Sequence, residues 1–366
     1  MDTIELQMPD ENIDREALHE ASCSLYRDSM LIPPGRVVAM LATASMLQLD
    51  EVIQQCVEVM KETVSAQTVC SYYYSAESYG LLTIRTMCLQ WLLDNMMTQC
   101  SEGLLREVNL DLMKEVIASS ELLVMGVEMD VYTMLKKWMF LQLQPTWRGL
   151  LSALFPDTDS WFAKYRRDLE GTPFLETEQG RAFLPVFQQL RLAYIIWDLM
   201  SARVIHQDGL TPAAWLCPVY KEHWLGPLQA EQTRKLWPMD VYVSDPQGNS
   251  MRCGGQLHSD KQCRWQWEGF NFSWDLVVCY ANQHIIFRCS TRNKSRSLGV
   301  TLLWHRKVAF CLRLSSLDRD GRAVFRKRTE YLMLSLRKSQ ELEVMNLEKQ
   351  DVVFLIYVAC NFLYLH

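Results

Sequence analysis

The sequence lacks the motifs by which many enzymes can be recognised. Its 366 residues contain no glycine-rich phosphate loop, no Gly-x-Ser-x-Gly, no His-Glu-x-x-His and no Cys-x-x-Cys. The seven histidines are scattered, and His19, His206 and His223 lie in amphipathic or loop segments where a structural role is the more common one. We therefore expect a non-catalytic protein that functions by binding, with no cofactor and no small-molecule substrate.

Long apolar runs are also missing. The longest, residues 352–365, is shorter than the roughly 20 residues that a membrane-spanning helix needs. Its β-branched and aromatic residues favour buried strands over a membrane anchor. The opening MDTIELQMPD lacks the charged and apolar regions of a signal peptide. We therefore expect the twelve cysteines to be reduced and mostly to serve as small core residues.

The charge is unevenly distributed along the chain. Of 37 Lys+Arg and 43 Asp+Glu, residues 251–366 hold 18 and 10, which leaves 19 and 33 for residues 1–250. The front of the chain is therefore acidic, with a net charge of −14, and the back is basic, with +8. This asymmetry indicates two modules with different roles, and the basic one favours an acidic partner.

Apolar residues recur at helical spacing over most of the first 236 residues. Gly80 separates two helices within residues 68–95, and Val131, Leu135, Trp138 and Met139 form one stripe of a later helix. Residues 145–175 are interrupted by three prolines and are predicted to be irregular. Residues 183–205 are predicted to form one long amphipathic helix.

The pattern changes after Gly248. Short alternating or apolar runs separated by turns predict an antiparallel β-sandwich. The sequence therefore predicts an α+β, multidomain chain. We expect domains at residues 1–62, 63–236 and 251–366, with a linker at 237–250.

Two groups of side chains in the last domain have competing interpretations. Cys253, His258 and Cys263 suggest zinc, but their spacing matches no standard finger and no fourth ligand is evident, so we expect no metal. The aromatic residues could form a binding surface, but alternation along a strand also suits a sandwich core. We favour the core for most of them, with one or two at its rim. These residues are Trp265, Trp267, Phe270, Phe272 and Trp274.

The order of elements near the start resembles the second half of a BTB/POZ domain. A short strand at Ile4 leads to a helix ending in SLYRD, a two-proline corner, the alanine-rich segment LATASM and the closing LQLDEVIQQC. The next segment, TVCSYYYSAESYGLLTIRTMCLQWLLDN, is similar to the opening helix pair of a BACK domain. The later EMDVYTMLKKWM resembles another BACK helix.

Further blocks narrow the resemblance to one family. LETEQG, QQLRLAYIIWDLMSARVIHQD, GNSMRCGG, WQWEGFNFSWDL and the terminal CNFLYL look like the germ cell-less family of BTB-BACK proteins. The resemblance runs from about Ile4 to the end. It implies a partial BTB/POZ domain and an all-helical BACK region, followed by the family's β-sandwich-like domain.

The resemblance also implies a function. Such proteins act as adaptors of cullin-3 ubiquitin ligases, and we expect the last domain to hold the degradation target. The family further implies a germ-cell or spermatogenesis role, and a place in the nucleus, the nuclear matrix or peripherally at the inner nuclear envelope. The alternatives are an architectural or transcription-regulating protein that binds lamina-associated proteins or transcription-factor subunits, and a shortened product that lacks cullin binding.

The BTB portion that would precede Ile4 normally carries most of the homodimer interface and the hydrophobic-x-acidic cullin loop. Within this sequence, the resemblance therefore makes residues 68–97 the best cullin-facing element, with Tyr72, Tyr73 and Tyr79 as candidates. For these tyrosines a core position is the competing interpretation. Arg326, Lys327 and Arg328 are candidates for a partner-binding rim, although a solvated hairpin explains three basic residues equally well.

Overall fold

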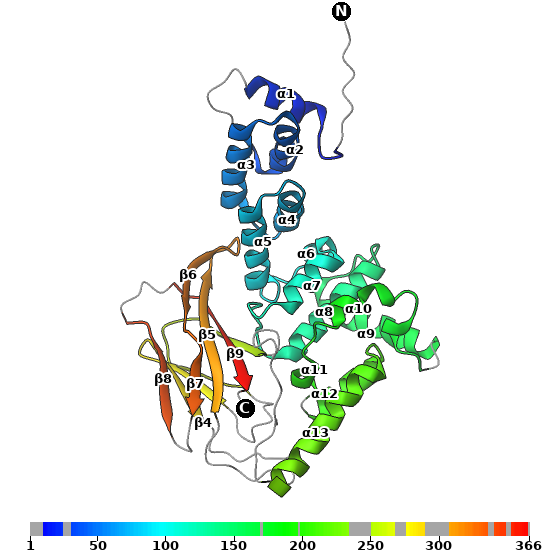
Figure 1. The fold of residues 1–366 in the computed structure, drawn as a ribbon, viewed down its shortest axis with the longest axis vertical. Coiled ribbons are helices and arrows are strands. Elements are labelled where there is room, and N and C mark those ends of the chain that lie inside the picture. Colours follow the sequence, from blue (N-terminus) through cyan, green and yellow to red (C-terminus); the bar gives the residue numbers. More distant parts are fainter. Residues whose placement is uncertain are drawn as a thin grey trace, which may run out of the picture. The chain divides into compact units, whose positions relative to one another are not determined.

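The computed structural model describes residues 10–24, 31–168, 171–196, 198–233, 250–267, 276–289, 307–335, 340–348 and 353–364. Within them, helices extend to Thr233 and antiparallel sheets begin at Met251 (Figure 1), which confirms the predicted α+β class. The strand expected at residues 4–8, residues 237–249 of the expected linker, and Phe270, Phe272 and Trp274 lie outside the described residues.

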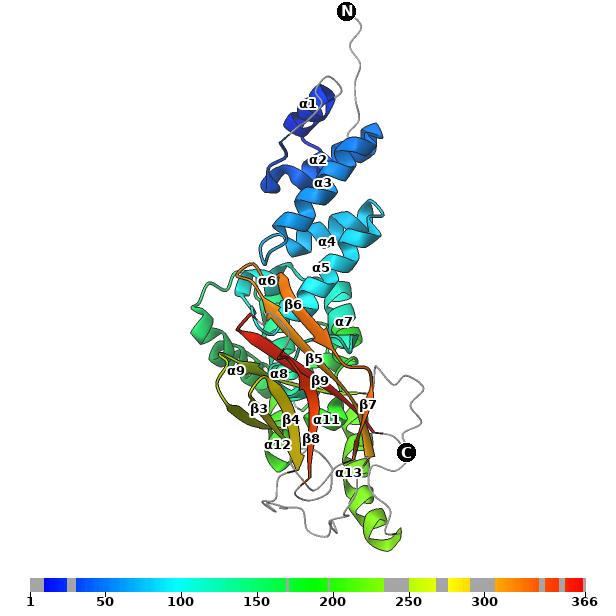
Figure 2. The same ribbon diagram turned by 90° about the vertical axis from the view of Figure 1, so that its left-hand side faces the viewer.

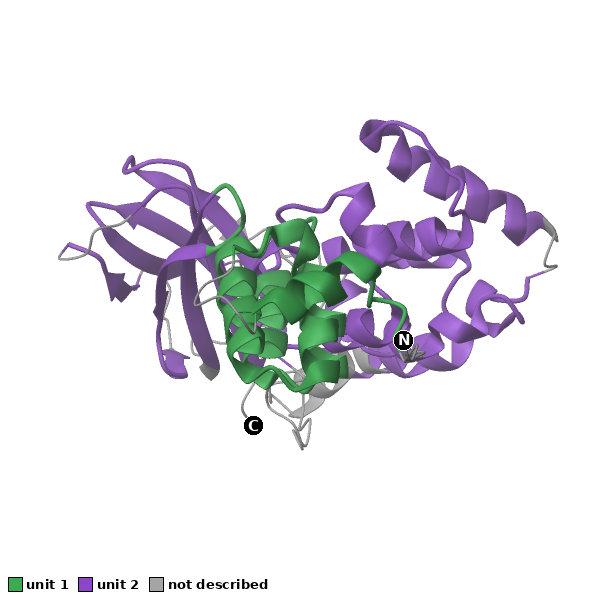
Figure 3. Cartoon of the chain, turned by 90° about the horizontal axis from the view of Figure 1, so that it is seen from above, with its two compact units in different colours: residues 1–93, 319–322 green, residues 94–318, 323–366 purple. Residues whose placement is uncertain are grey.

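The chain divides into two compact units, which Figure 3 colours separately. Unit 1 consists of residues 1–93 and Arg319–Arg322, and unit 2 consists of residues 94–318 and 323–366. The domain boundaries expected from the sequence stay predictions, because nearly all of the proposed linker lies outside the described residues.

Unit 1 is built from consecutive helices. These are α1 (Arg15–Ser24), α2 (Val37–Leu47), α3 (Asp50–Thr63), α4 (Val69–Ser78) and α5 (Leu82–Asn95), whose last two residues belong to unit 2. Pro34 begins a 3-10 turn that leads directly into α2, where its missing N–H group costs no helical hydrogen bond. Gly80 has a φ of +70° and allows the reversal between α4 and α5, because glycine adopts this left-handed conformation without strain.

The helices of unit 2 begin with the end of α5. The others are α6 (Glu102–Glu107), α7 (Leu110–Ala118), α8 (Glu128–Leu143), α9 (Leu151–Asp168), α10 (Leu184–Phe187), α11 (Leu192–Ile195), α12 (Leu199–Asp208) and α13 (Ala213–Thr233). Two predictions are wrong here. Residues 145–175 contain the 18-residue helix α9, and residues 183–205 form three short helices instead of one.

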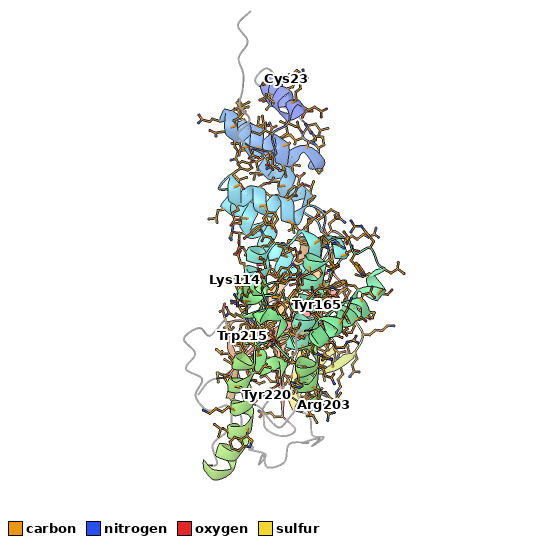
Figure 4. All side chains as sticks on the ribbon, turned by 90° about the vertical axis from the view of Figure 1, so that its right-hand side faces the viewer. Cys23, Lys114, Tyr165, Arg203, Trp215 and Tyr220 are labelled. Carbon is orange, nitrogen blue, oxygen red and sulfur yellow. The ribbon has the colours of Figure 1, made fainter. Side chains whose placement is uncertain are left out.

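Tertiary contacts explain both differences. Helix α9 continues past its internal Pro156, and its Trp161 ring packs against Phe140, Phe174 and Tyr165, the last of which is labelled in Figure 4. The segment 183–205 is interrupted where Arg191 donates to the backbone carbonyl of Ser250. Asp198 then caps α12 by accepting from the Ser201 amide at 2.7 Å.

Among the described residues of unit 2, nine strands form two antiparallel sheets. They are β1 (Met251–Leu257), β2 (Cys263–Trp267), β3 (Leu276–Ala281), β4 (His284–Cys289), β5 (Lys307–Leu317), β6 (Ala323–Arg328), β7 (Leu332–Ser335), β8 (Glu341–Asn346) and β9 (Ile356–Tyr364). One sheet has the order β1-β9-β5-β6, with β7 also paired to β5, and the other has the order β2-β3-β4-β8. Figure 2 shows β5, β6 and β9 side by side.

The core of the sandwich is formed by the inward faces of the two sheets. Phe287 of β4 contacts Phe310 of β5 and Phe362 of β9, with ring centroids 5.2 and 6.5 Å apart. Trp265 packs against this core and against Gly255, in agreement with the core interpretation. The apolar run at residues 352–365 contains β9, which lies in the centre of its sheet, so the predicted buried strand is confirmed.

In unit 2, the segment that contains Ser120, Glu121 and Gly126 lies against the five-stranded sheet. We call the contacts between the helical part and this sheet the joint. The backbone N–H of Gly254 in β1 donates to Gly126 O at 3.1 Å. Asn361 of β9 donates to Ser120 O at 2.9 Å. Arg313 of β5 contacts Glu121 at 2.9 Å. Within unit 2, the sandwich and the helices are therefore connected by polar contacts as well as by the chain.

Candidate functional site

Two of the three candidate tyrosines, which lie on α4 or directly after it, are core residues. Tyr72 and Tyr73 are buried. The Tyr72 hydroxyl lies 2.8 Å from the Thr63 hydroxyl, and burial raises its pKa. The Arg85 guanidinium lies over the Tyr73 ring, 5.0 Å from its centroid. Tyr72 therefore holds the helix pair against α3 and Tyr73 packs within the pair, so neither side chain forms an exposed surface.

Tyr79 is half-buried and connects the end of α4 to the start of the described chain. Its hydroxyl donates to the Asp10 carboxylate. Burial and this carboxylate raise the pKa of Tyr79 to about 12, and the hydrogen bond lowers the pKa of Asp10. Tyr79 thus fixes the segment before α1 to the helix pair.

The exposed surface of the helix pair is formed by other residues. It includes Ser71, Glu77, Ser78, Thr83 and Thr86. Leu82, the first residue of α5, is 71% exposed. The sequence contains the signal for Leu82: it follows the Gly80 turn and falls outside the apolar stripe of Leu81, Ile84 and Cys88.

The basic rim on β6 is largely paired within unit 2. Arg326 forms an ion pair with Asp94, which is nearly buried, and Arg328 lies 3.2 Å from Glu121. Lys327 donates to the Asn346 backbone carbonyl at 2.7 Å. Two of the three cations are therefore neutralised by carboxylates and Lys327 is held by a carbonyl, so this rim offers an acidic partner less charge than three consecutive basic residues indicate.

A buried ion cluster, formed by Glu128, Arg191 and Arg252, lies at the joint. The Glu128 carboxylate, fully buried at the start of α8, accepts from Arg252 Nε at 2.9 Å and from Arg252 Nη2 at 2.8 Å. Arg191 Nη1 lies 3.8 Å from the same carboxylate. Burial and the neighbouring Arg252 lower the pKa of Arg191 to about 9.

The arrangement of the ion cluster indicates a structural role. Arg252 also donates to the Ile117 and Ser119 backbone carbonyls, each at 2.8 Å, so most of its donors are satisfied. A carboxylate enclosed by two arginines has little capacity left for general base catalysis. The sequence signal for this cluster is Glu128 itself, an acidic residue on the same helical stripe as Val131 and Leu135.

The described residues contain no group of three or more His, Cys, Asp or Glu side chains arranged to hold a metal ion. Cys253 is in the sandwich core, where its thiol lies 3.6 Å from the Cys360 carbonyl oxygen and burial raises its pKa. His258 is exposed. Among the described helices, none is long and apolar enough to cross a membrane.

His284, at the start of β4, makes a pH-dependent contact with the region of β8. Its Nε2 lies 3.1 Å from Glu348 Oε1 and its Nδ1 lies 3.1 Å from Glu343 Oε1. Hydrogen bonding to Glu348, and then to Glu343, raises the pKa of His284. The charged imidazolium therefore holds two carboxylates beside the bulge between Ile285 and Ile286.

Because the pKa of His284 is higher in the folded state than its unfolded value of about 6.5, its protonation stabilises the fold below that pH. This contribution is lost as the pH rises through the folded pKa. We expect His284→Gln to lower the thermal unfolding midpoint at about pH 5.5 and to leave it unchanged at about pH 8. The control is His258→Gln, because His258 is exposed. Equal changes in the unfolding midpoint of the His284 variant at both pH values would contradict the assignment of this pH dependence to His284.

Comparison with known proteins places the whole sequence in one family. The chain is 54% identical to mouse Germ cell-less protein-like 1 over 365 residues, which cover all of this chain and 70% of that protein. It is 53% identical to human Germ cell-less protein-like 2, over the whole chain and 69% of that protein. The chain belongs to the germ cell-less family. The family resemblance seen in the sequence is thereby confirmed.

The germ cell-less family also includes more distant relatives of this chain. Protein germ cell-less of Drosophila melanogaster is 29% identical over 98% of this chain and 67% of its own length. No protein-family model matches the sequence. The germ cell-less assignment therefore depends on these relatives, and the BTB and BACK resemblances stay predictions.

Proposed function

We propose that this germ cell-less family member is a substrate-recognition adaptor of a cullin-3 ubiquitin ligase. The observation that carries the proposal is the run of helical hairpins α2–α3 and α4–α5, at the residues that the BTB and BACK resemblances assign to them. The ligase chemistry belongs to the recruited partners, and this chain is non-catalytic. A germ-cell role and a place in the nucleus or at the nuclear envelope are parts of the same proposal, supported by the family resemblance.

The exposed surface of α4 and α5 is the proposed contact with cullin-3. Tyr72, Tyr73 and Tyr79 position the helices from within, and Leu82 is the large apolar side chain that they leave exposed. A partner that covers this leucine removes its apolar surface from water, which favours binding. The cullin-3 contact is therefore assigned to Leu82 and its exposed neighbours.

We expect Leu82→Asp to weaken binding of the cullin-3 N-terminal domain at least tenfold, about 1.4 kcal/mol, because a carboxylate would replace a side chain buried on binding. The measurement is a titration of the full chain by isothermal calorimetry. Leu31→Asp is the matched control, since Leu31 is also an exposed leucine of unit 1. Equal affinity of the wild type and the Leu82 variant would contradict the assignment.

A second titration tests the proposed function itself. The chain is compared with a version extended by the preceding BTB half of a germ cell-less relative. Binding of both at similar strength supports a sufficient contact on α4 and α5. If only the extended version binds cullin-3, the present chain is restricted to target binding. If neither version binds, the result favours the alternative, an architectural or transcription-regulating protein of the nuclear periphery.

A further inference from the structure

The connection between α8 and α9 carries a cluster of exposed apolar side chains. Leu150, Leu151 and Phe155 are 77%, 59% and 45% exposed. Leu151 and Phe155 are four residues apart on α9 and therefore share one face of the helix. Single exposed apolar residues need no explanation, but three large ones within six positions form a patch.

The backbone before this patch is held in a fixed conformation. Arg106 of α6 donates to Pro145 O at 2.8 Å and to Trp147 O at 2.6 Å, and Glu102 orients its guanidinium. The Trp147 indole N–H donates to Asp157 at 3.0 Å, and its ring packs on Phe140. A surface that is already ordered loses less conformational entropy on binding, so the patch is suited to recognition.

Two cations flank the apolar side chains. Lys137 Nζ lies 5.4 Å from the centroid of the Phe155 ring. The Arg148 guanidinium donates to the carbonyls of Pro145 and Trp147, at 3.0 and 2.9 Å. Neither cation is within salt-bridge distance of a carboxylate among the described parts of the chain, whereas Arg326 and Arg328 of the basic rim are both paired.

We propose that Leu150, Leu151 and Phe155, with Lys137 and Arg148, form a docking surface for an acidic peptide segment of a partner protein. The segment would place large apolar side chains on the leucines and Phe155, and its carboxylates beside the two cations. Charge complementarity selects this occupant, because the cations are unneutralised in the described structure. The proposal goes beyond the adaptor function and does not depend on cullin-3 binding, since the residues differ from those on α4 and α5.

The test uses the full chain and a fluorescein-labelled peptide composed of glutamate, leucine and phenylalanine, with binding followed by fluorescence anisotropy. We expect the double variant Leu150→Asp, Leu151→Asp and the single variant Arg148→Glu each to weaken binding at least tenfold. The controls are Leu199→Asp and Arg203→Glu on α12, because Leu199 is 65% exposed and Arg203, labelled in Figure 4, is exposed. Both controls should bind as the wild type does.

Several outcomes would overturn the proposal. They are equal losses in the α12 controls, equal binding of a peptide with lysine in place of glutamate, and binding to phosphatidylserine vesicles without binding to the peptide. The last result would assign the patch to a membrane surface. Unfolding midpoints of all variants are measured in parallel, and Arg148→Glu keeps the test decisive if the double variant fails to fold.

Discussion

Replacing Glu128 with glutamine should destabilise unit 2 by about 3–5 kcal/mol, because it leaves two arginines without a counter-charge. Arg252 and Arg191 are only 1% and 8% exposed, so water cannot take the place of the carboxylate. The desolvation that the ion pairs offset in the wild type would remain as an uncompensated cost. The measurement is urea-induced unfolding of the full chain, followed by circular dichroism and tryptophan fluorescence.

The matched control for this prediction is Glu341→Gln. Glu341 pairs with Arg288 at 2.9 Å, but the two side chains are 51% and 42% exposed. Solvent screens such a pair, so its loss should change the free energy of unfolding by at most about 1 kcal/mol. Similar losses for the Glu128 and Glu341 variants would show that the buried cluster does not hold the joint together.

Substituting alanine for Gly254 should also weaken the joint, through steric overlap instead of charge. A Cβ at this position would lie 1.9 Å from Val124 O and 2.9 Å from Val358 O, and both are backbone atoms that cannot rotate away. We expect a loss of about 1–3 kcal/mol or more in the unfolding free energy, because β1 or the segment at Val124 must shift. The same urea titration measures it.

Gly103→Ala provides a control of opposite sign. Gly103 lies in α6, and a Cβ there would meet nothing within 4 Å. Alanine in an open helical position should be neutral or stabilising by up to about 1 kcal/mol, since it restricts the unfolded chain. A Gly254 variant as stable as the Gly103 variant would mean that the contact between β1 and Val124 is dispensable.

Local sequence patterns predicted those features of the fold that depend on a single helix, turn or strand. Gly80 marks a reversal that needs a left-handed residue, and Pro34 marks a helix start that needs no N–H group. The apolar run around β9 was predictable because strands buried on both faces lack alternation. The germ cell-less resemblance likewise followed from blocks of sequence, and the relatives confirm it.

The candidate sites were less predictable, because exposure depends on what covers a side chain. The same segment contains three candidate tyrosines that differ in exposure. Tyr72 and Tyr73 are buried, and Tyr79 is half-buried. Arg326 and Arg328 form a basic run in the sequence, but their acidic partners, Asp94 and Glu121, are more than 200 residues away along the chain. Pairing at such separations leaves no local pattern.

By itself, the sequence determined the helical front, the β-sandwich at the back, the reversal at Gly80 and the family. The first three depend on the spacing of apolar residues or on the conformational limits of single residues, both of which are local properties of the chain. The family follows from resemblance between blocks of sequence. Only the tertiary structure decided that α9 continues through Pro156, that residues 183–205 break into three helices, and that Glu128 meets Arg252. These features arise from contacts between distant segments, where the free energy of packing and ion pairing exceeds local preference.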